Sequence, residues 1–298
     1  MKDALYFPDS GNGQYHNPVL FCDYSDPDVI RVGDIYYMTA SSFNYVPGLP
    51  ILISKDLVNW TLVNYALPRI PEERYNTPRH AQGVWGPAIR YHDGLFYICY
   101  GMPDEGIFMV RTADPLGEWD APVCVLQGKG LIDPCPFWDD DGKAYIIHGY
   151  ARSRIGFKSF LGIFPVSEDG LHAIGEDHIL YNGLATQPTI EGPKVYKRNG
   201  WYYLMIAEGG TEYGHMIVLA KGQTPWGPFT SCPHNPILTN RNKAPGIIQG
   251  IGHGDLIQAR DGSWFLLTLG FRQIHVWQAF HHLGREVFLT PARFGGDG

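Results

Sequence analysis

Three carboxylates stand at matching places in the sequence and are suited to acid–base chemistry. Asp26 comes seven residues before the glycine of a Gly-Asp turn sequence, and Asp133 and Glu191 come nine residues before the glycines of Asp-Gly and Asn-Gly turn sequences. An ionised carboxylate can activate water or attack a sugar carbon, while a protonated one donates to the leaving oxygen, so paired carboxylates suggest glycoside hydrolysis. A third carboxylate beside the acid would raise the pKa of that acid.

Two further side chains share this spacing. His253 and Trp85 each lie nine residues before the glycine of an Asp-Gly turn sequence. All five offsets are odd, so the two-residue period of a strand sends the five side chains to equivalent faces. A turn beside a proline explains any single aspartate, but it does not explain an acid at the same place in three of five copies. We therefore expect the three carboxylates, the histidine and the tryptophan at one mouth of a shared channel.

The structure that must position these residues is a repeated hairpin. Five turn sequences have their glycine at positions 33, 94, 142, 200 and 262, with spacings of 61, 48, 58 and 62 residues. An aromatic-rich segment follows each turn, at 36–39, 96–100, 145–148, 202–206 and 264–268. Antiparallel hairpins at this period are typical of propellers with four-stranded blades. The sequence predicts an all-β, five-bladed propeller that fills residues 1–298 as a single catalytic domain. A β-sandwich with coincidental hairpins is the alternative.

Composition agrees with a β-protein and narrows the range of partners. The 298 residues include 15 Phe, 8 Trp and 18 Tyr, side chains that favour strands. The net charge of −7 argues against nucleic acid or an anionic membrane as a partner. No stretch approaches 18 consecutive apolar residues, so we expect no membrane span. The sequence carries no expectation about oligomeric state.

The five cysteines are odd in number, widely spaced and without a CxxC pair. This pattern favours buried thiols over a disulfide framework or a zinc site. No basic segment followed by an apolar run opens the chain, so we expect a cytoplasmic protein. A secreted form whose signal has been removed is the alternative.

Several motifs, in order along nearly the whole chain, resemble those of glycoside hydrolase family 43. That family consists of five-bladed propellers that act on sugars derived from xylan and arabinan. The motifs are Tyr24-Ser-Asp-Pro-Asp-Val, Ser41-Ser-Phe-Asn-Tyr-Val-Pro-Gly, Ser54-Lys-Asp-Leu-Val-Asn-Trp, Trp85-Gly-Pro-Ala-Ile-Arg-Tyr, Ile132-Asp-Pro-Cys-Pro-Phe, Ile190-Glu-Gly-Pro-Lys and Ala207-Glu-Gly-Gly-Thr.

The resemblance implies an inverting glycosidase that releases β-D-xylose or α-L-arabinofuranose from plant-derived oligosaccharides. It implies that Asp26 is the general base, that Glu191 is the general acid, and that Asp133 orients the acid and raises its pKa. Inversion requires about 6.5–9.5 Å between the base and acid carboxyls, which leaves room for the attacking water.

The resemblance also implies supporting residues. Arg272, in the last repeat, matches an arginine that binds sugar hydroxyls; a surface ion pair is the alternative for this residue. Phe43 and Trp85 are expected to line the site because sugar faces stack on aromatic rings, with packing between blades as their alternative. The histidine matched by His253 usually lies in the channel under the substrate, where it holds a water or a calcium ion. No cofactor is required, and because calcium prefers oxygen ligands, any ion at His253 would be bound largely through waters.

Several alternatives stay open. Many relatives with xylosidase activity continue into a β-sandwich that contributes to the rim of the site, whereas this sequence stops at the edge of the propeller. Exo or endo action and the preferred sugar therefore stay open. A carbohydrate-binding propeller without turnover is the alternative to an enzyme. A related retaining fructosidase would need an Asn-Asp-Pro-Asn motif, which the sequence lacks.

Overall fold

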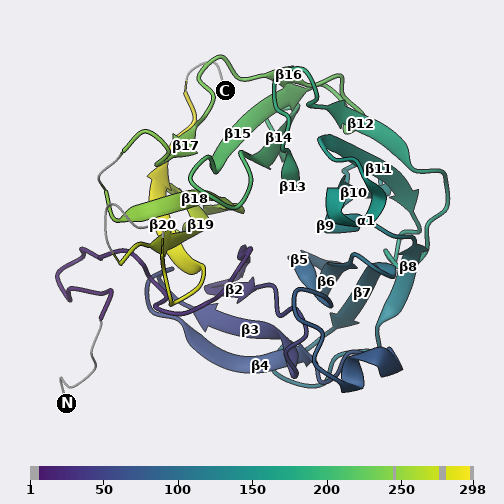
Figure 1. Ribbon diagram of the computed structural model, residues 1–298, viewed down its shortest axis with the longest axis horizontal. Helices are drawn as coiled ribbons and strands as arrows, with labels where there is room; N and C mark the ends of the chain where they lie inside the picture. Colours follow the sequence, from purple (N-terminus) through teal and green to yellow (C-terminus); the bar gives the residue numbers. More distant parts are fainter. Residues whose placement is uncertain (1–6, 244–245, 275–279, 296–298) are drawn as a thin grey trace.

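Five antiparallel sheets stand like blades around a central axis (Figure 1). The computed structural model describes residues 7–243, 246–274 and 280–295, and these are almost entirely strands, turns and loops. In each blade the first strand lies nearest the axis and the following strands pair outward in chain order. The predicted five-bladed propeller is confirmed.

Each blade follows the predicted repeat, and the five aromatic-rich segments all fall in the second strand of a blade. The strands are, blade by blade, β1 (Asp28–Val32), β2 (Ile35–Thr39), β3 (Gly48–Ser54) and β4 (Thr61–Leu67); β5 (Trp85–His92), β6 (Leu95–Met102), β7 (Gly106–Thr112) and β8 (Val123–Gln127); β9 (Leu131–Trp138), β10 (Ala144–Tyr150), β11 (Phe160–Val166) and β12 (His178–Asn182); β13 (Glu191–Arg198), β14 (Trp201–Glu208), β15 (Met216–Gly222), β16 (Thr230–Ser231) and β17 (Leu238–Thr239); β18 (Ile248–Gln258), β19 (Trp264–Arg272) and β20 (Glu286–Ala292). Two short helices, η1 (Glu73–Asn76) and α1 (Arg152–Ile155), lie in connections between strands.

The glycine-marked turns join the first two strands of each blade. In the second blade His92 pairs with Leu95, so the turn is the two residues Asp93 and Gly94, with φ of 45° and 81°. Two consecutive residues with positive φ fit a hairpin turn whose twist matches that of the strands, which is why glycine recurs there.

The N-terminal segment pairs with the last strand and closes the ring. The amide of Val19 donates to the carbonyl of Val287 in β20 at 2.8 Å. Asn17 exchanges two hydrogen bonds of 2.8 Å with the backbone of Leu289. This pairing covers an edge of the fifth blade that would otherwise be open to another strand.

Apolar side chains fill the space between neighbouring blades. One cluster joins the first two blades through fully buried residues such as Ile51, Ile98 and Met102. A second joins the third and fourth blades through Ile147, Leu161 and Leu204. These clusters fix the blades relative to one another, so the starts of the five inner strands are held on one face of the disc.

The cysteines are all free thiols. Cys99 and Cys135 are buried as predicted, but Cys22 and Cys124 are exposed and Cys232 is half-buried. No helix in the described ranges is long and apolar enough to cross a membrane.

Candidate active site

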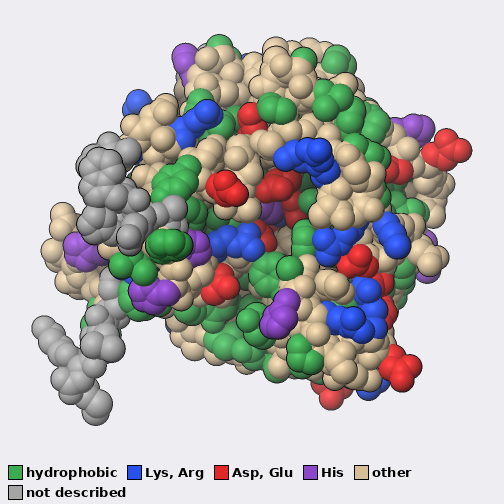
Figure 2. Space-filling model, in the orientation of Figure 1, with side chains coloured by type: hydrophobic (Ala, Val, Ile, Leu, Met, Phe, Trp, Pro, Cys, Tyr) green, Lys and Arg blue, Asp and Glu red, His purple; other side chains and the backbone are tan. Residues whose placement is uncertain are grey.

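A cavity of about 260 Å³ opens where the inner strands begin. Acidic side chains gather in a hollow near the centre of this face, with basic side chains beside it (Figure 2). Six of the seven residues expected at the site line the cavity, together with four that the sequence did not single out for it. The lining residues are Asp26, Phe43, Trp85, Asp133, Glu191 and His253, and also Ala81, Ile132, Thr211 and Arg285.

Unusual backbone geometry turns these side chains toward the axis. Asp26, Asp133 and His253 have positive φ of 53°, 52° and 30°, a conformation that L-residues seldom adopt. The ladders between the first two strands slip near these positions in four of the blades. Such bulges re-aim side chains, and strain of this kind concentrates at functional sites.

The surroundings of Asp26 favour its ionised form. Its Oδ2 accepts a 2.5 Å hydrogen bond from Ser41, while its Oδ1 lies 3.2 Å from Arg285 and 3.5 Å from Nδ1 of His253. Burial alone would raise the pKa of Asp26, but the charge of Arg285, the nearby imidazole of His253 and the Ser41 hydrogen bond outweigh it and leave the pKa below its usual value. The carboxylate is therefore ready to accept a proton from water.

Glu191 has the opposite character. Burial, followed by repulsion from ionised Asp26, raises the pKa of Glu191 to about 7, although Arg285 and Lys158 act against this rise. A carboxyl group with this pKa is mostly protonated in mildly acidic solution and still about half protonated at neutral pH. The pKa values of the two carboxyl groups are thus shifted in opposite directions, so that one is ionised while the other can hold a proton. This is the pattern of an acid–base pair.

Asp133 lies between the two in the strand order and is buried. The amide of Gly192, the residue after Glu191, donates to Oδ2 of Asp133 at 2.9 Å. Burial and repulsion from Glu191 and Asp26 hold the pKa of Asp133 well above its usual value. A β-carbon added at Gly86 would collide with this carboxyl group, so the backbone of the second blade packs directly on it.

The arginine at the site is Arg285, whereas the sequence placed it at Arg272. Within the described part of the chain, Arg272 does not line the cavity. Its guanidinium makes two 2.8 Å hydrogen bonds to buried Glu286 and lies over the ring of Phe21 at 4.5 Å. Arg285 directly precedes Glu286, the first residue of β20. Its side chain lines the cavity and contacts Asp26.

Two aromatic side chains form one wall. The rings of Phe43 and Trp85 meet edge to face, with centroids 6.4 Å apart and an interplanar angle of 71°. Both line the cavity, where aromatic faces can receive the apolar face of a sugar ring. Their position agrees with the expected substrate-lining role.

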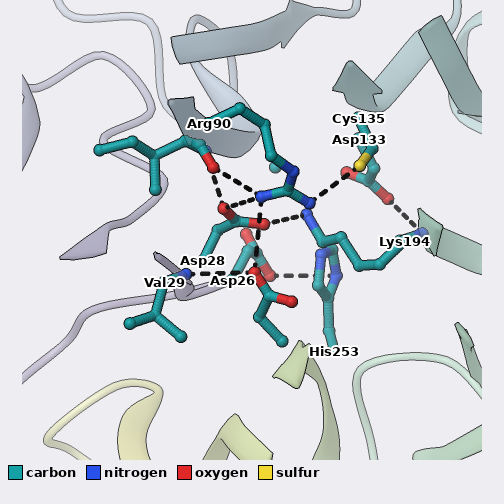
Figure 3. A network of polar contacts seen from close by, with 12 residues as sticks. Asp26, Asp28, Val29, Arg90, Asp133, Cys135, Lys194 and His253 are labelled. Atoms are coloured by element: carbon teal, nitrogen blue, oxygen red, sulfur yellow. Dashed lines mark hydrogen bonds and ion pairs between the residues drawn. The ribbon is translucent and has the colours of Figure 1, made fainter. Parts of the chain in front are cut away.

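A buried network of charges lies beside the site (Figure 3). Lys194 lies 2.7 Å and Arg90 lies 2.8 Å from the carboxylate of Asp28, and Arg90 lies 3.5 Å from Asp255. Removing one partner of such a buried pair leaves an uncompensated charge in the interior. Loss of any single member of the network should therefore destabilise the fold.

The residues of this network do not supply the oxygen-rich set of ligands that calcium prefers. Lys194 and Arg90 bring two positive charges to it, whereas calcium takes six to eight oxygen ligands. Among the described residues, no three His, Cys, Asp or Glu side chains are grouped so that they could hold a metal. The Nε2 atom of His253 is buried and finds no partner in the described ranges, which leaves it to a water or a substrate hydroxyl.

Comparisons with known proteins agree with this geometry. The sequence model of Glycosyl hydrolases family 43 matches residues 15–298. The chain is 38% identical over 291 residues to the non-reducing end alpha-L-arabinofuranosidase BoGH43B of Bacteroides ovatus, covering 95% of this chain and 52% of that protein. It is 34% identical over 304 residues to a xylan 1,3-beta-xylosidase of a Vibrio species, covering 94% of this chain and 56% of the relative.

Solved structures give the same result. The crystal structure of a xylan beta-1,4-xylosidase from Bacillus halodurans superposes with a TM-score of 0.85 at 32% identity, over 95% of this chain and 55% of that one. The GH43B protein of Bacteroides ovatus superposes with a TM-score of 0.82 at 37% identity and the same coverage. The chain spans about half the length of these relatives. Its propeller fold, its three carboxylates in one cavity and a match over residues 15–298 make the chain a member of glycosyl hydrolases family 43.

Proposed function

We propose that the protein is an inverting glycoside hydrolase that cleaves β-D-xylosides, α-L-arabinofuranosides or both in oligosaccharides derived from hemicellulose. The observation that carries this proposal is the pairing of Asp26, whose pKa is lowered, with Glu191, whose pKa is raised to about 7, in one cavity. The two sugar classes come from the relatives, an alpha-L-arabinofuranosidase and a xylan 1,3-beta-xylosidase.

The proposed mechanism uses the two carboxyls on opposite sides of the glycosidic bond. Asp26 accepts a proton from a water molecule as that water attacks the anomeric carbon. Glu191 donates its proton to the leaving oxygen as the bond breaks. Asp133 orients the acid, because its carboxyl group accepts a hydrogen bond from the amide of Gly192, the residue after Glu191. Arg285 holds Asp26 ionised while presenting donors to sugar hydroxyls.

A panel of aryl glycosides tests the proposal. We expect release of the aryl group from β-D-xyloside, α-L-arabinofuranoside or both, with β-glucoside and β-galactoside unchanged. Binding of xylobiose by calorimetry with no product from any member of the panel would instead identify a carbohydrate-binding propeller.

The pKa values predict the pH profile. Glu191 must be protonated to act, so kcat/KM should fall as the pH rises through about 7. Asp26 must be ionised, and because its pKa is lowered, activity should fall only in distinctly acidic solution. Initial rates between pH 3 and pH 9, corrected for enzyme stability, measure both limbs. A flat profile across neutrality would contradict the assignment of Glu191.

We also propose that turnover needs no metal. The proposed steps use only carboxyl groups and water, and the buried network beside the site already contains two cations of the chain, Arg90 and Lys194. Dialysis against EDTA should leave the rate within about twofold of the untreated enzyme. A loss of rate that calcium restores would show that an ion takes part.

A further inference from the structure

Trp85 carries a buried donor that nothing in the described part of the chain satisfies. Its ring lines the cavity, and its indole Nε1 is buried without a hydrogen-bond partner there. Buried indole N–H groups normally find a hydrogen-bond partner, because a buried donor without one lowers the stability of the fold. A substrate hydroxyl in the cavity would supply the missing acceptor. The orientation of this ring therefore bears directly on sugar binding.

Arg154 holds the ring from outside the cavity. The centre of its guanidinium lies 5.1 Å from the centroid of the Trp85 ring, within the range of a cation–π contact. The two residues come from different blades, because Trp85 begins β5 and Arg154 belongs to α1 in the connection between β10 and β11. Arg154 is not among the residues that line the cavity in the described ranges, so it acts on the site only through its neighbours.

The guanidinium of Arg154 is held in place by three hydrogen bonds to two residues. Its Nε and Nη2 donate to the two carboxylate oxygens of Asp104 at 3.2 and 3.3 Å, and Nη2 also donates to the carbonyl of Ala81 at 3.3 Å. The side chains of Arg154 and Asp104 are only 18% and 21% exposed, so water screens this pair less than a pair at the surface. Ala81 lines the cavity. The Arg154 side chain thus links three connections between strands, one of which reaches the cavity.

We propose that Arg154 is a positioning residue for sugar binding, which sets the Trp85 ring so that its indole N–H serves a sugar hydroxyl. The proposal rests on the proposed glycosidase function. A planar, forked cation is needed, because it must bind a carboxylate edge-on while its face covers an aromatic ring. Lysine keeps the charge but cannot do both.

Kinetics of three variants test the proposal. Arg154→Ala should lower kcat/KM by about five- to thirtyfold, mostly through a higher KM, because the contact acts on binding more than on the acid or base. Arg154→Lys should recover only part of this loss. Arg152→Ala is the matched control, since it removes the same charge from an exposed position on the same helix and should leave both constants unchanged. Melting temperatures show whether each variant is folded.

A double-mutant cycle separates positioning from a general structural role. If Arg154 acts through Trp85, Arg154→Ala should have almost no further effect on xylose or arabinose affinity in a Trp85→Ala background. Effects that simply add, or an Arg154→Ala variant with wild-type KM, would overturn the proposal. Should Arg154→Ala fail to fold, Arg154→Lys takes its place in the cycle, with the same two outcomes.

One readout is independent of turnover. In protein labelled with ¹⁵N-tryptophan, the indole N–H resonance of Trp85, assigned by its loss in Trp85→Phe, should shift in Arg154→Ala and stay in place in Arg152→Ala. An unmoved resonance would overturn the positioning role even if no substrate had been found. Absence of hydrolysis by the wild-type protein, with the resonance shifted, would count against the proposed function alone.

Discussion

Replacing Asp26 by asparagine is expected to lower kcat by about 10²–10⁴-fold, the range attributed to a general base. Asparagine has the same shape, but its amide cannot take a proton from the attacking water. The loss should be similar for aryl xyloside and arabinofuranoside, because the water is activated in the same way whatever the leaving group. Stopped assays with purified variant, long enough to detect the residual rate, provide the measurement.

Asp93→Asn is the matched control for this variant. Asp93 is an exposed residue with φ of 45° in a hairpin turn, a conformation that asparagine also tolerates. It should keep full activity. Calorimetry should show that Asp26→Asn still binds xylose or arabinose. An Asp26→Asn enzyme with more than a tenth of the wild-type rate would refute the role of base.

Replacing Glu191 by glutamine should produce a loss that depends on the leaving group. Substrates with poor leaving groups need a proton on the departing oxygen, so natural disaccharides should lose about 10²–10⁴-fold in kcat. Activated aryl glycosides, whose leaving groups depart without protonation, should lose far less. The fall in activity near pH 7 should also vanish for the aryl substrates, because the group responsible for it is gone.

Glu176→Gln, at an exposed position of the third blade, controls for loss of one negative charge. A series of aryl xylosides with graded leaving-group pKa gives the slope that separates the variants. A steep dependence on leaving group in Glu191→Gln and a shallow one in the wild type support the acid. Equal losses across the series would remove Glu191 from that role.

The repeat in the sequence was sufficient to locate the cavity. Counting back from the turn glycines selected Asp26, Asp133, Glu191, His253 and Trp85, and all five line one cavity. These offsets assume the two-residue period of a regular strand, whereas the inner strands carry bulges and residues with positive φ. It succeeded because the irregularity recurs near the same place in successive blades, so the offsets stay equivalent.

The arginine could not be located in this way. Arg285 lies at the end of the connection between β19 and β20, which has no counterpart marker in the other repeats. Arg272 matches the arginine that the family resemblance implies, but strand pairing places it against Glu286, a buried carboxylate fourteen residues away in the chain. Only the three-dimensional pairing shows which of the two guanidinium groups is already occupied.

The same strand periodicity predicts part of the buried charge network. Asp28 and Asp255 come two residues after Asp26 and His253, so the strand period places them on the same face, one layer deeper. Lys194 comes three residues after Glu191, an odd spacing that would place the two side chains on opposite faces of a regular strand. It can join the network because the ladder slips between these two residues. Periodicity alone therefore predicts the acidic members of the network, whereas its basic members depend on the bulges.

The stereochemistry of the first product tests the central claim most directly. Proton NMR during the first minutes of β-D-xyloside hydrolysis, or of α-L-arabinofuranoside hydrolysis if that is the better substrate, records which anomer is released before mutarotation. A base and an acid placed on either side of the glycosidic bond predict the inverted anomer, α-D-xylose or β-L-arabinofuranose, as the first signal. Initial appearance of the retained anomer would mean that a carboxylate attacks the sugar itself, and would contradict the account of Asp26 and Glu191 given above.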